Sequence, residues 1–288
     1  PERISAIMQY RRVAPISVAL KLSQVSDFCA AESTSAPATP MPAAESTAAL
    51  PTFGLIVIGD EILSGKRADK HLPKFVELLG ARGLALGWAQ YLGADPARIP
   101  PALRQAFASG DVVFCTGGIG ATPDDHTRQC AAAALGVPLA LHPGAKALIE
   151  ERMQDVAREK GLPYEPERPD NQHRLNMGMF PRGARLMPNP YNKIPGFVCD
   201  RVYFAPGFPV MAWPMMAWAL DSDWSHCFGQ RRWRERSVVL YGSMEATLTP
   251  VMQRVEAAHP GVKVFSLPSV DHPQHGAHIE LGVKGSAA

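Results

Sequence analysis

The feature that most constrains the fold is an uninterrupted apolar run of strand length, FGLIVIG at residues 53–59, which ends in glycine. A strand that is apolar on both faces is typical of the interior of a parallel sheet. A predicted helix at 70–83, a strand at 84–92, a helix at 102–108 and a strand at 111–115 follow. Strands and helices that alternate at this spacing predict a doubly wound α/β domain with a mostly parallel sheet.

The rest of the chain divides into three predicted parts. Residues 52–220 form the α/β domain, which we expect to continue with helices at 125–135 and 143–160 and short strands at 185–187 and 202–204. Residues 221–288 read as a small α+β subdomain, with strands at 237–241, 262–266 and 278–283 and a helix at 246–258.

Residues 1–51 are predicted to be a disordered extension. Of residues 31–51, 17 of 21 are Ala, Ser, Thr or Pro, a composition that buries too little apolar surface to fold. Residues 1–30 are weakly basic and resemble a targeting segment, and the alternative is a dispensable extension before a start at Met41.

Composition excludes several classes of protein. No segment has the roughly 18–20 consecutive apolar residues that a membrane helix needs. The net charge of +2 is too small for a general nucleic-acid footprint. Five widely spaced cysteines suggest neither a disulfide framework nor a zinc knuckle, so we expect a cytoplasmic protein.

The strongest local signal for chemistry is TGGIGATPDDHT at 116–127, between the strand at 111–115 and the next helix. Its glycines allow positive φ and close ligand approach, and successive amides beside a helix start offer an anion cradle. The alternative is purely structural: Thr122 as N-cap, Pro123 in the first helical position, and Asp124 and Asp125 in the first turn. For the two carboxylates, both readings stay open.

Two carboxylates beside an anion cradle would repel a phosphate unless something compensates. A divalent cation could bridge carboxylate and phosphate oxygens. Alternatively, the ligand could offer N–H donors, as the 2-amino-4-oxo edge of a pterin or guanine does to a single aspartate. Either option predicts a phosphate-bearing pterin or nucleotide as the ligand.

A second polar cluster follows the first predicted strand, in GDEILSG at 59–65 and at Asp69. It lies at the carboxyl end of that strand, the same sheet edge as the glycine turn, so the two motifs can face one site. A metal or substrate site is one interpretation. For Ser64 and Asp69 a turn and a helix cap are the other.

Other motifs support less chemistry. His272, His275 and His278 have metal-like spacing, but Pro273 and Gly276 interrupt any regular element that would align them. The basic run RRWRER at 231–236 is expected to be a solvated strand rather than a nucleic-acid patch. Signatures of esterases, P-loop NTPases and zinc proteases are missing from the sequence.

Six motifs in order carry a family resemblance: GDEILSGK (59–66) with Asp69, TGGIGATPDDHTR (116–128), LGVPLALHP, PNP (188–190), IPGF (194–197) and PGFP (206–209). Together they resemble the N-terminal domain of the competence/damage-inducible protein A family, which is related to the MoaB/Mog-type molybdopterin-binding fold. The resemblance covers about residues 53–220. It implies a three-layer domain that binds molybdopterin, or a related nucleotide, at the glycine turn.

The resemblance also implies roles for residues. Asp125 ends the glycine motif and corresponds to a position of the pterin site, and related domains cleave nucleotide diphosphates such as ADP-ribose or FAD with Mg, Mn or Co. The candidate catalytic residues are Asp124 and Asp125, and the candidate metal ligands are Asp60, Glu61 and Asp124. The candidate ligand-binding residues are Gly59, Ser64, Gly65, Asp69, Asp95, Thr116, Gly117, Gly118, Gly120, Thr127, Asn189, Gly196 and Gly207.

The chain departs from the family pattern at Ala94-Asp95, at Asp69-Lys70-His71 and at Met211, where carboxylates or an Asp-Thr-Asn triplet are usual. The absence of these carboxylates argues against metal-dependent hydrolysis more strongly than it argues against binding. A C-terminal amidase domain is not expected after Leu220, so neither is nicotinamide-nucleotide deamidation.

Three functional hypotheses follow: a pterin or nucleotide binder, a metal-dependent pyrophosphatase, and a non-catalytic interaction domain. In the third, the apolar segment 205–218 forms the face of a homo-oligomer, and the simpler interpretation places it in the core. We expect a small-molecule ligand and neither nucleic acid nor membrane as partner.

Overall fold

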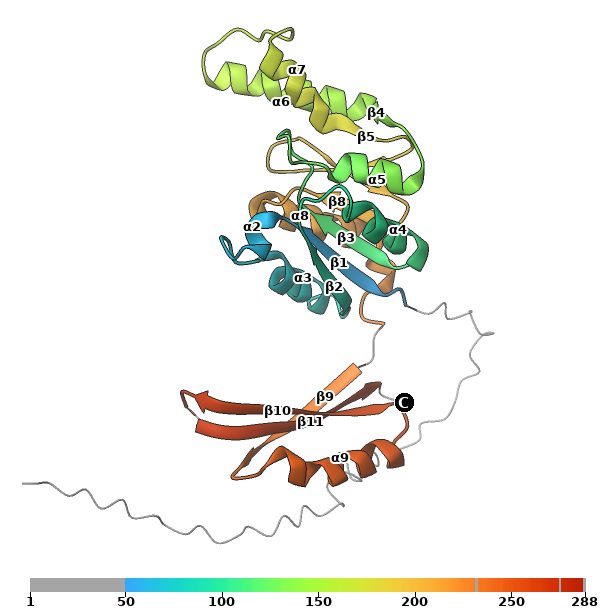
Figure 1. Ribbon diagram of the computed structural model, residues 1–288, viewed down its shortest axis with the longest axis vertical. Helices are drawn as coiled ribbons and strands as arrows, with labels where there is room; N and C mark the ends of the chain where they lie inside the picture. The colour runs from blue at the N-terminus through green and yellow to red at the C-terminus, as the bar shows by residue number, and fades with distance from the viewer. Residues whose placement is uncertain (1–49, 231–232, 275, 287–288) are drawn as a thin grey trace, which may run out of the picture. The chain divides into compact units, whose positions relative to one another are not determined.

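The computed structural model describes residues 50–230, 233–274 and 276–286 (Figure 1). The predicted extension at 1–51 therefore lies outside the described residues, except for its last two. Leu50 already packs against the core of the domain. Among the described residues, no helix is both long enough and apolar enough to cross a membrane.

The centre of the main domain is a six-stranded sheet in the order β2-β1-β3-β8-β7-β6. Its first four strands are mutually parallel, and β7 runs antiparallel to both of its neighbours, β8 and β6, which confirms the predicted mostly parallel α/β sheet. The strands are β1 (Phe53–Ile58), β2 (Leu86–Leu92), β3 (Val112–Thr116), β8 (Val202–Ala205), β7 (Gly196–Cys199) and β6 (Arg185–Met187).

Two hydrophobic clusters pack against the sheet, one on each face. Leu55 and Val57 of β1 belong to the cluster that includes Phe75 of α3 (His71–Gly80) and the buried face of α8 (Pro209–Asp223). Ile56 and Ile58 belong to the opposite cluster, with residues of α4 (Ile99–Ser109) and α5 (Thr127–Leu135). The alternation along β1 therefore produces the three-layer arrangement.

Within the apolar segment 205–218, the core interpretation holds for α8. This helix buries Ala212, Met215, Met216, Ala219 and Leu220 in the first cluster. Phe208 and Val210 stay exposed, at 57% and 52%.

An accessory layer interrupts the sheet between α5 and β6. It consists of β4 (Leu139–Leu141), α6 (Pro143–Glu159), α7 (Pro169–Leu175), a 3-10 turn (Asn176–Gly178) and β5 (Met179–Pro181). The sequence predicted α6 but not the antiparallel β4–β5 pair, because strands of three residues are too short to show a period. This layer faces α5, which it contacts mainly through β5.

The part after residue 232 is a three-stranded antiparallel sheet, β10-β11-β9, with one helix. Its elements are β9 (Trp233–Tyr241), α9 (Glu245–Ala258), β10 (Val262–His272) and β11 (Gly276–Ser286). The strands are longer than predicted because paired backbone continues past the apolar positions. Leu248 and Val255 of α9 and Ile279 of β11 are its buried side chains, which agrees with the expected α+β character.

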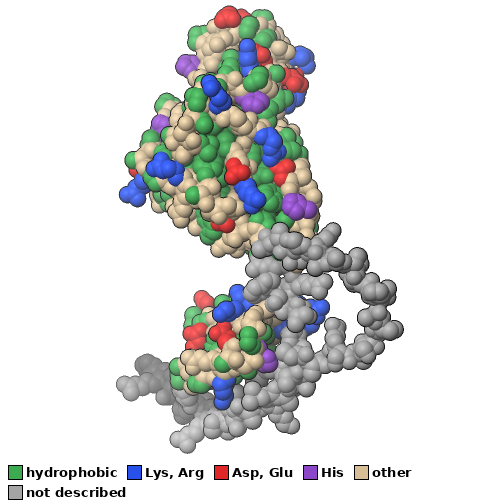
Figure 2. All heavy atoms as spheres, turned by 90° about the vertical axis from the view of Figure 1, so that its right-hand side faces the viewer, with side chains coloured by type: hydrophobic (Ala, Val, Ile, Leu, Met, Phe, Trp, Pro, Cys, Tyr) green, Lys and Arg blue, Asp and Glu red, His purple; other side chains and the backbone are tan. Residues whose placement is uncertain are grey.

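Charged side chains are distributed over the main domain without gathering by sign on the visible face. Figure 2 shows Lys and Arg interspersed with Asp and Glu there. Anion recognition on this face must therefore come from local groups rather than from a broad positive patch.

Candidate functional site

Three strand ends meet at one edge of the sheet. The β1–β3 register pairs Val57 with Thr116, and the β3–β8 register pairs Thr116 with Ala205, so Gly59, Gly117 and Gly207 follow side by side. The amide of Gly117 donates to the Ala205 carbonyl at 3.0 Å. This edge is where doubly wound sheets bind ligands.

Gly117 and Gly118 tolerate no side chain. Gly117 has φ +96, and a Cβ there would lie 2.1 Å from the Ile58 carbonyl oxygen. Gly118 has φ +68, and a Cβ there would lie 2.2 Å from the Thr127 hydroxyl oxygen. The close approach of β1, of the turn and of α5 therefore requires glycine at both positions.

The carbonyl groups of the glycine turn are held by residues of α5. Thr127, which is fully buried, donates through Oγ1 to the Gly117 carbonyl at 3.0 Å, and its amide donates to the Gly118 carbonyl at 3.0 Å. Arg128 donates through Nη1 to the carbonyls of Ile119 and Gly120. The predicted ligand residue Thr127 thus shapes the turn.

The amide groups of the same turn remain available. No described residue accepts a hydrogen bond from the amides of residues 118–121, although the carbonyls on this turn are engaged. The turn therefore presents successive N–H donors, which is the arrangement that binds phosphate oxygens.

Asp125 closes a short loop and does not sit in a helix. Its Oδ2 accepts from the amide of Thr122 at 2.8 Å and from the Thr122 hydroxyl at 2.6 Å. The helix α5 begins only at Thr127, after His126. The predicted cap of Thr122 and Pro123 is therefore wrong, because Thr122 is the donor to Asp125 instead of an acceptor for helix amides.

The candidate metal ligands do not form a site as they lie. Asp60 accepts from the amide of Ala94 at 3.1 Å, Glu61 is exposed beside Gly59, and Asp124 is exposed on the glycine turn. Within the described ranges no three His, Cys, Asp or Glu side chains are arranged to hold a metal ion, so this set does not fit the predicted ion.

Asp69 serves as a helix cap. Its carboxylate accepts from the amides of His71 and Leu72 at 2.8 and 3.0 Å and from the Tyr91 hydroxyl at 2.8 Å. Burial raises the pKa of Asp69, but these hydrogen bonds outweigh it, so the pKa is lowered overall. Burial and the bond to Asp69 raise the pKa of Tyr91 to about 12. The capping interpretation is thus confirmed for Asp69, whereas Ser64 and Gly65 lie exposed in the turn after α2 (Asp60–Leu63).

His71 and Thr116 are buried polar residues at the same edge. The Nε2 atom of His71 lies 3.0 Å from the Gly207 carbonyl oxygen, which ties α3 to the loop after β8. Among the described residues, His71 Nδ1 and Thr116 Oγ1 are buried with no hydrogen-bond partner. Sequence reasoning noted His71 only as a departure from the family pattern, because its burial depends on α3 packing against that loop.

Asp95, Asn189 and Gly196 have local structural contacts. Asp95 accepts from the Ala97 amide at 2.8 Å, and buried Asn189 donates to the Ile194 carbonyl at 2.9 Å. Gly196 lies at the start of β7, where a Cβ would be 2.1 Å from the Phe204 carbonyl oxygen. These contacts give the three residues local structural roles, and their part in ligand binding stays a prediction.

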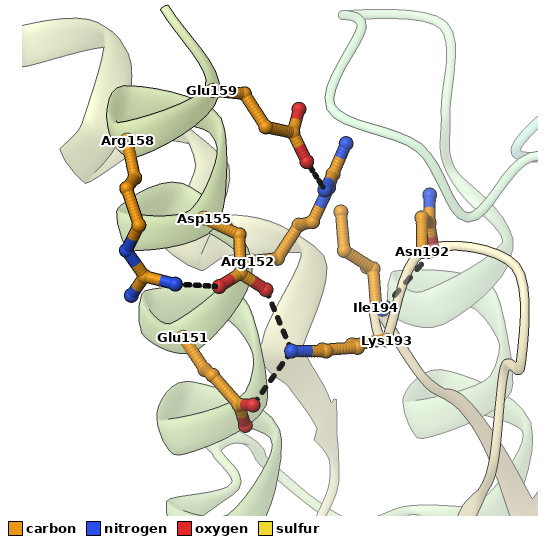
Figure 3. A network of polar contacts seen from close by, with 8 residues as sticks. All are labelled: Glu151, Arg152, Asp155, Arg158, Glu159, Asn192, Lys193 and Ile194. Carbon is orange, nitrogen blue, oxygen red and sulfur yellow. Dashed lines mark hydrogen bonds and ion pairs between the residues drawn. The ribbon is translucent and has the colours of Figure 1, made fainter. Parts of the chain in front are cut away.

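The loop that holds Asn189 is anchored to the accessory layer by an ion-pair network (Figure 3). Lys193 donates to Glu151 and Asp155 of α6 at 2.7 and 2.6 Å, and Arg158 also reaches Asp155. The hydrogen bond that Lys193 donates lowers the pKa of Asp155. Lys193 has φ +66, so its backbone is in the left-handed region.

A cleft of about 460 Å³ lies on the other flank of the glycine turn. One wall is the turn and the start of α5, with Thr122, Asp125 and Arg128. The opposite wall comes from the accessory layer, with His173, Asn176 and Met179. Sequence reasoning found Asp125 but missed the second wall, since its residues are 48 or more positions away and carry no motif.

Comparison with known proteins agrees with this geometry. A family model described as a probable molybdopterin binding domain matches residues 54–223. A CinA-like protein of Anaeromyxobacter dehalogenans (strain 2CP-1) is 32% identical over 160 residues, which are 54% of this chain and 37% of that protein. A CinA-like protein of Gloeobacter violaceus is 28% identical over 247 residues, 83% of this chain and 54% of that protein.

One solved structure is similar over the same region. The protein CinA from Thermoplasma acidophilum, described as being of unknown function, is 26% identical, with a TM-score of 0.50. The match covers 60% of this chain and 98% of that one. The chain therefore spans only part of the length of the curated relatives that it matches, whereas its main domain covers nearly all of this structure.

Proposed function

Because the chain belongs, through residues 54–223, to the family of probable molybdopterin binding domains, we propose that it binds a phosphate-bearing pterin or nucleotide at the glycine turn. Family membership by itself supports a related binding or biosynthetic role. Molybdopterin, or a nucleotide that resembles it, is the specific ligand that we propose.

The observation that carries the proposal is the set of unengaged amides at residues 118–121. Gly117, Gly118 and Gly120 would surround the phosphate, because the carbonyls of this turn already point to Thr127 and Arg128. An oxyanion that accepts from these N–H groups gains both the hydrogen bonds and the local dipole.

Asp125 would hold the heterocycle of the ligand. Its Oδ2 is occupied by Thr122, while its Oδ1 accepts from no described residue. A carboxylate oxygen in this position pairs with ring N–H donors of a pterin or guanine edge. The same pairing removes the repulsion expected between a phosphate and two bare carboxylates.

Binding and product analysis test the proposal directly. Isothermal titration with molybdopterin, ADP-ribose and FAD, each with and without Mg²⁺, Mn²⁺ or Co²⁺, should show binding without turnover. Metal-stimulated release of AMP would replace it with the pyrophosphatase hypothesis, in which Asp124→Asn or Asp125→Asn abolishes turnover.

A pair of glycine variants locates the ligand. Gly118→Ala should abolish binding, because the new methyl group meets the Thr127 hydroxyl in a turn with φ +68. Gly136→Ala is the matched control, since its φ of +67 carries the same backbone strain but its Cβ meets open space. Equal loss of binding in both variants, or retained binding in Gly118→Ala, would overturn the placement of the phosphate.

A further inference from the structure

Helices α3 and α8 run side by side in the same direction, and hydrogen bonds join them at both ends. At the ends far from the glycine turn, Arg82 donates to the two carboxylate oxygens of Asp221 at 2.6 and 2.8 Å. At the near ends, His71 Nε2 lies 3.0 Å from the carbonyl oxygen of Gly207. The imidazole is therefore placed to fix the start of α8 against the sheet edge that carries the glycine turn.

The loop that joins β8 to α8, residues 206–208, depends on this contact. Among the described residues, no other group forms a hydrogen bond with Pro206 or Gly207. Gly207 is exposed, and a Cβ on it would lie 3.4 Å from the Cα of Gly117, so the loop touches the glycine turn. His71 is only 4% exposed, and Asp69 accepts from its amide at 2.8 Å. A firmly held side chain thus holds an exposed loop.

The hydrogen bond from His71 also sets the direction of the amide that follows. A carbonyl oxygen can only accept, so the bond places a proton on Nε2 of the ring. The peptide between Gly207 and Phe208 is trans, and in a trans peptide the C=O and N–H groups point in opposite directions. The Phe208 N–H therefore points away from the buried ring, and no described residue accepts from it.

We propose that His71 is a positioning residue of the phosphate site. By holding the Gly207 carbonyl, it keeps the loop 206–208 against Gly117 with the Phe208 amide turned outward, so that the amides of the loop and of the glycine turn stay in one arrangement. Without this bond, the peptide samples other orientations, and the measured affinity falls with the fraction that is competent to bind. The inference rests on the proposed function, because the anion at the glycine turn is its readout.

Two variants separate the donor of His71 from the ring that carries it. His71→Phe keeps a ring but has no donor, whereas His71→Gln has no ring but can place an amide N–H near the position of Nε2. Titration with ribose 5-phosphate should show about tenfold weaker binding for His71→Phe, the change expected from one lost hydrogen bond, and binding within about twofold of wild type for His71→Gln.

The thermal midpoint should follow the ring instead of the donor. In His71→Phe the apolar ring also removes Nδ1, which is buried without a partner among the described residues, and water can reach the exposed Gly207. This variant should therefore be at least as stable as His71→Gln, the opposite order to that of the affinities. His226→Phe, at an exposed histidine just beyond the far end of α8, is the matched control and should leave the affinity unchanged.

Amide spectra report on the loop itself. The Phe208 N–H resonance should shift when ribose 5-phosphate is added to wild type and to His71→Gln, and should shift much less in His71→Phe at the same concentration.

The outcomes distinguish the two proposals. Wild-type affinity in His71→Phe, equal losses in both His71 variants, or a loss that parallels the thermal midpoint would overturn the role of His71 and leave the phosphate site in place. If the wild-type protein does not bind ribose 5-phosphate, the proposed phosphate site is wrong and the positioning role is wrong with it.

Discussion

Two polar side chains, Asp69 and Arg128, determine the local backbone of the candidate site at the scale of single residues. Asp69 holds the first amides of α3, whose His71 contacts the loop at Gly207. Arg128 donates to the carbonyls of Ile119 and Gly120 and so fixes their orientation. Each residue acts by satisfying backbone groups that would otherwise be buried without partners.

Asp69 makes the stability of α3 depend on pH. Because its pKa is lowered in the folded state, its contribution is fully present above the pKa of the unfolded chain, about 3.9, and is lost as the pH falls through the folded value. At pH 7, Asp69→Ala should lower the free energy of unfolding by about 1 kcal/mol, the usual cost of a lost helix cap.

Denaturant unfolding at pH 7 and near pH 3 measures this dependence. The difference in the free energy of unfolding between wild type and Asp69→Ala should be smaller at the lower pH. Tyr91→Phe keeps the carboxylate but loses one donor to it, so it should show part of the same effect. A difference that stays constant with pH would show that the carboxylate charge does not stabilise α3.

The loop between β6 and β7 shows, at the scale of elements, how backbone strain is balanced by charge. Lys193 and Asp200 are the non-glycine residues with positive φ among those described, at +66 and +52. Lys193 is held against α6 by Glu151 and Asp155 (Figure 3), whereas no salt bridge among the described residues includes Asp200. The ion pairs thus compensate an unfavourable backbone conformation at the loop.

Replacing each of these residues by glycine separates strain from charge. Asp200→Gly should raise the free energy of unfolding, because glycine adopts positive φ without steric cost. Lys193→Gly should raise it less, since the same change removes both ion pairs. The difference in the free energy of unfolding between the two variants should be smaller in 1 M NaCl, which screens exposed charges. Thermal unfolding at low and high salt measures this difference. A difference that does not change with salt would contradict the role of the ion pairs.

The chain as a whole consists of parts with separate cores. Both hydrophobic clusters of the main domain draw, among the described residues, only on positions between Leu50 and Phe228. The later sheet buries its own side chains, Leu248, Val255 and Ile279, between α9 and β11. Such self-contained packing is typical of separate folding units.

A shortened chain tests this division. Residues 50–230 alone should fold cooperatively, with the thermal midpoint of the main domain unchanged, and should keep the affinity for ribose 5-phosphate. Circular dichroism and titration of the shortened and full chains provide the comparison. A marked loss of stability on shortening would show that the C-terminal part completes the core of the main domain.

The order of the elements was predictable because their signals are local. The apolar run at 53–59, the strand at 111–115 and the glycine turn each lie within a few residues, and parallel strands necessarily bring their carboxyl ends to one edge. The antiparallel pair of β6 and β7 and the short β4–β5 pair were less predictable, since both depend on partners far along the chain.

The sequence by itself determined the α/β class, the family and the position of the glycine turn, because buried strands and required glycines can be recognised from residues that are adjacent in the sequence. Only the tertiary structure decided that Asp69 caps a helix, that Arg128 holds the turn, and that His173, Asn176 and Met179 face Asp125 across a cleft. The physical reason is that burial and hydrogen-bond partners are properties of packed neighbours, and these neighbours come from segments that no local pattern connects.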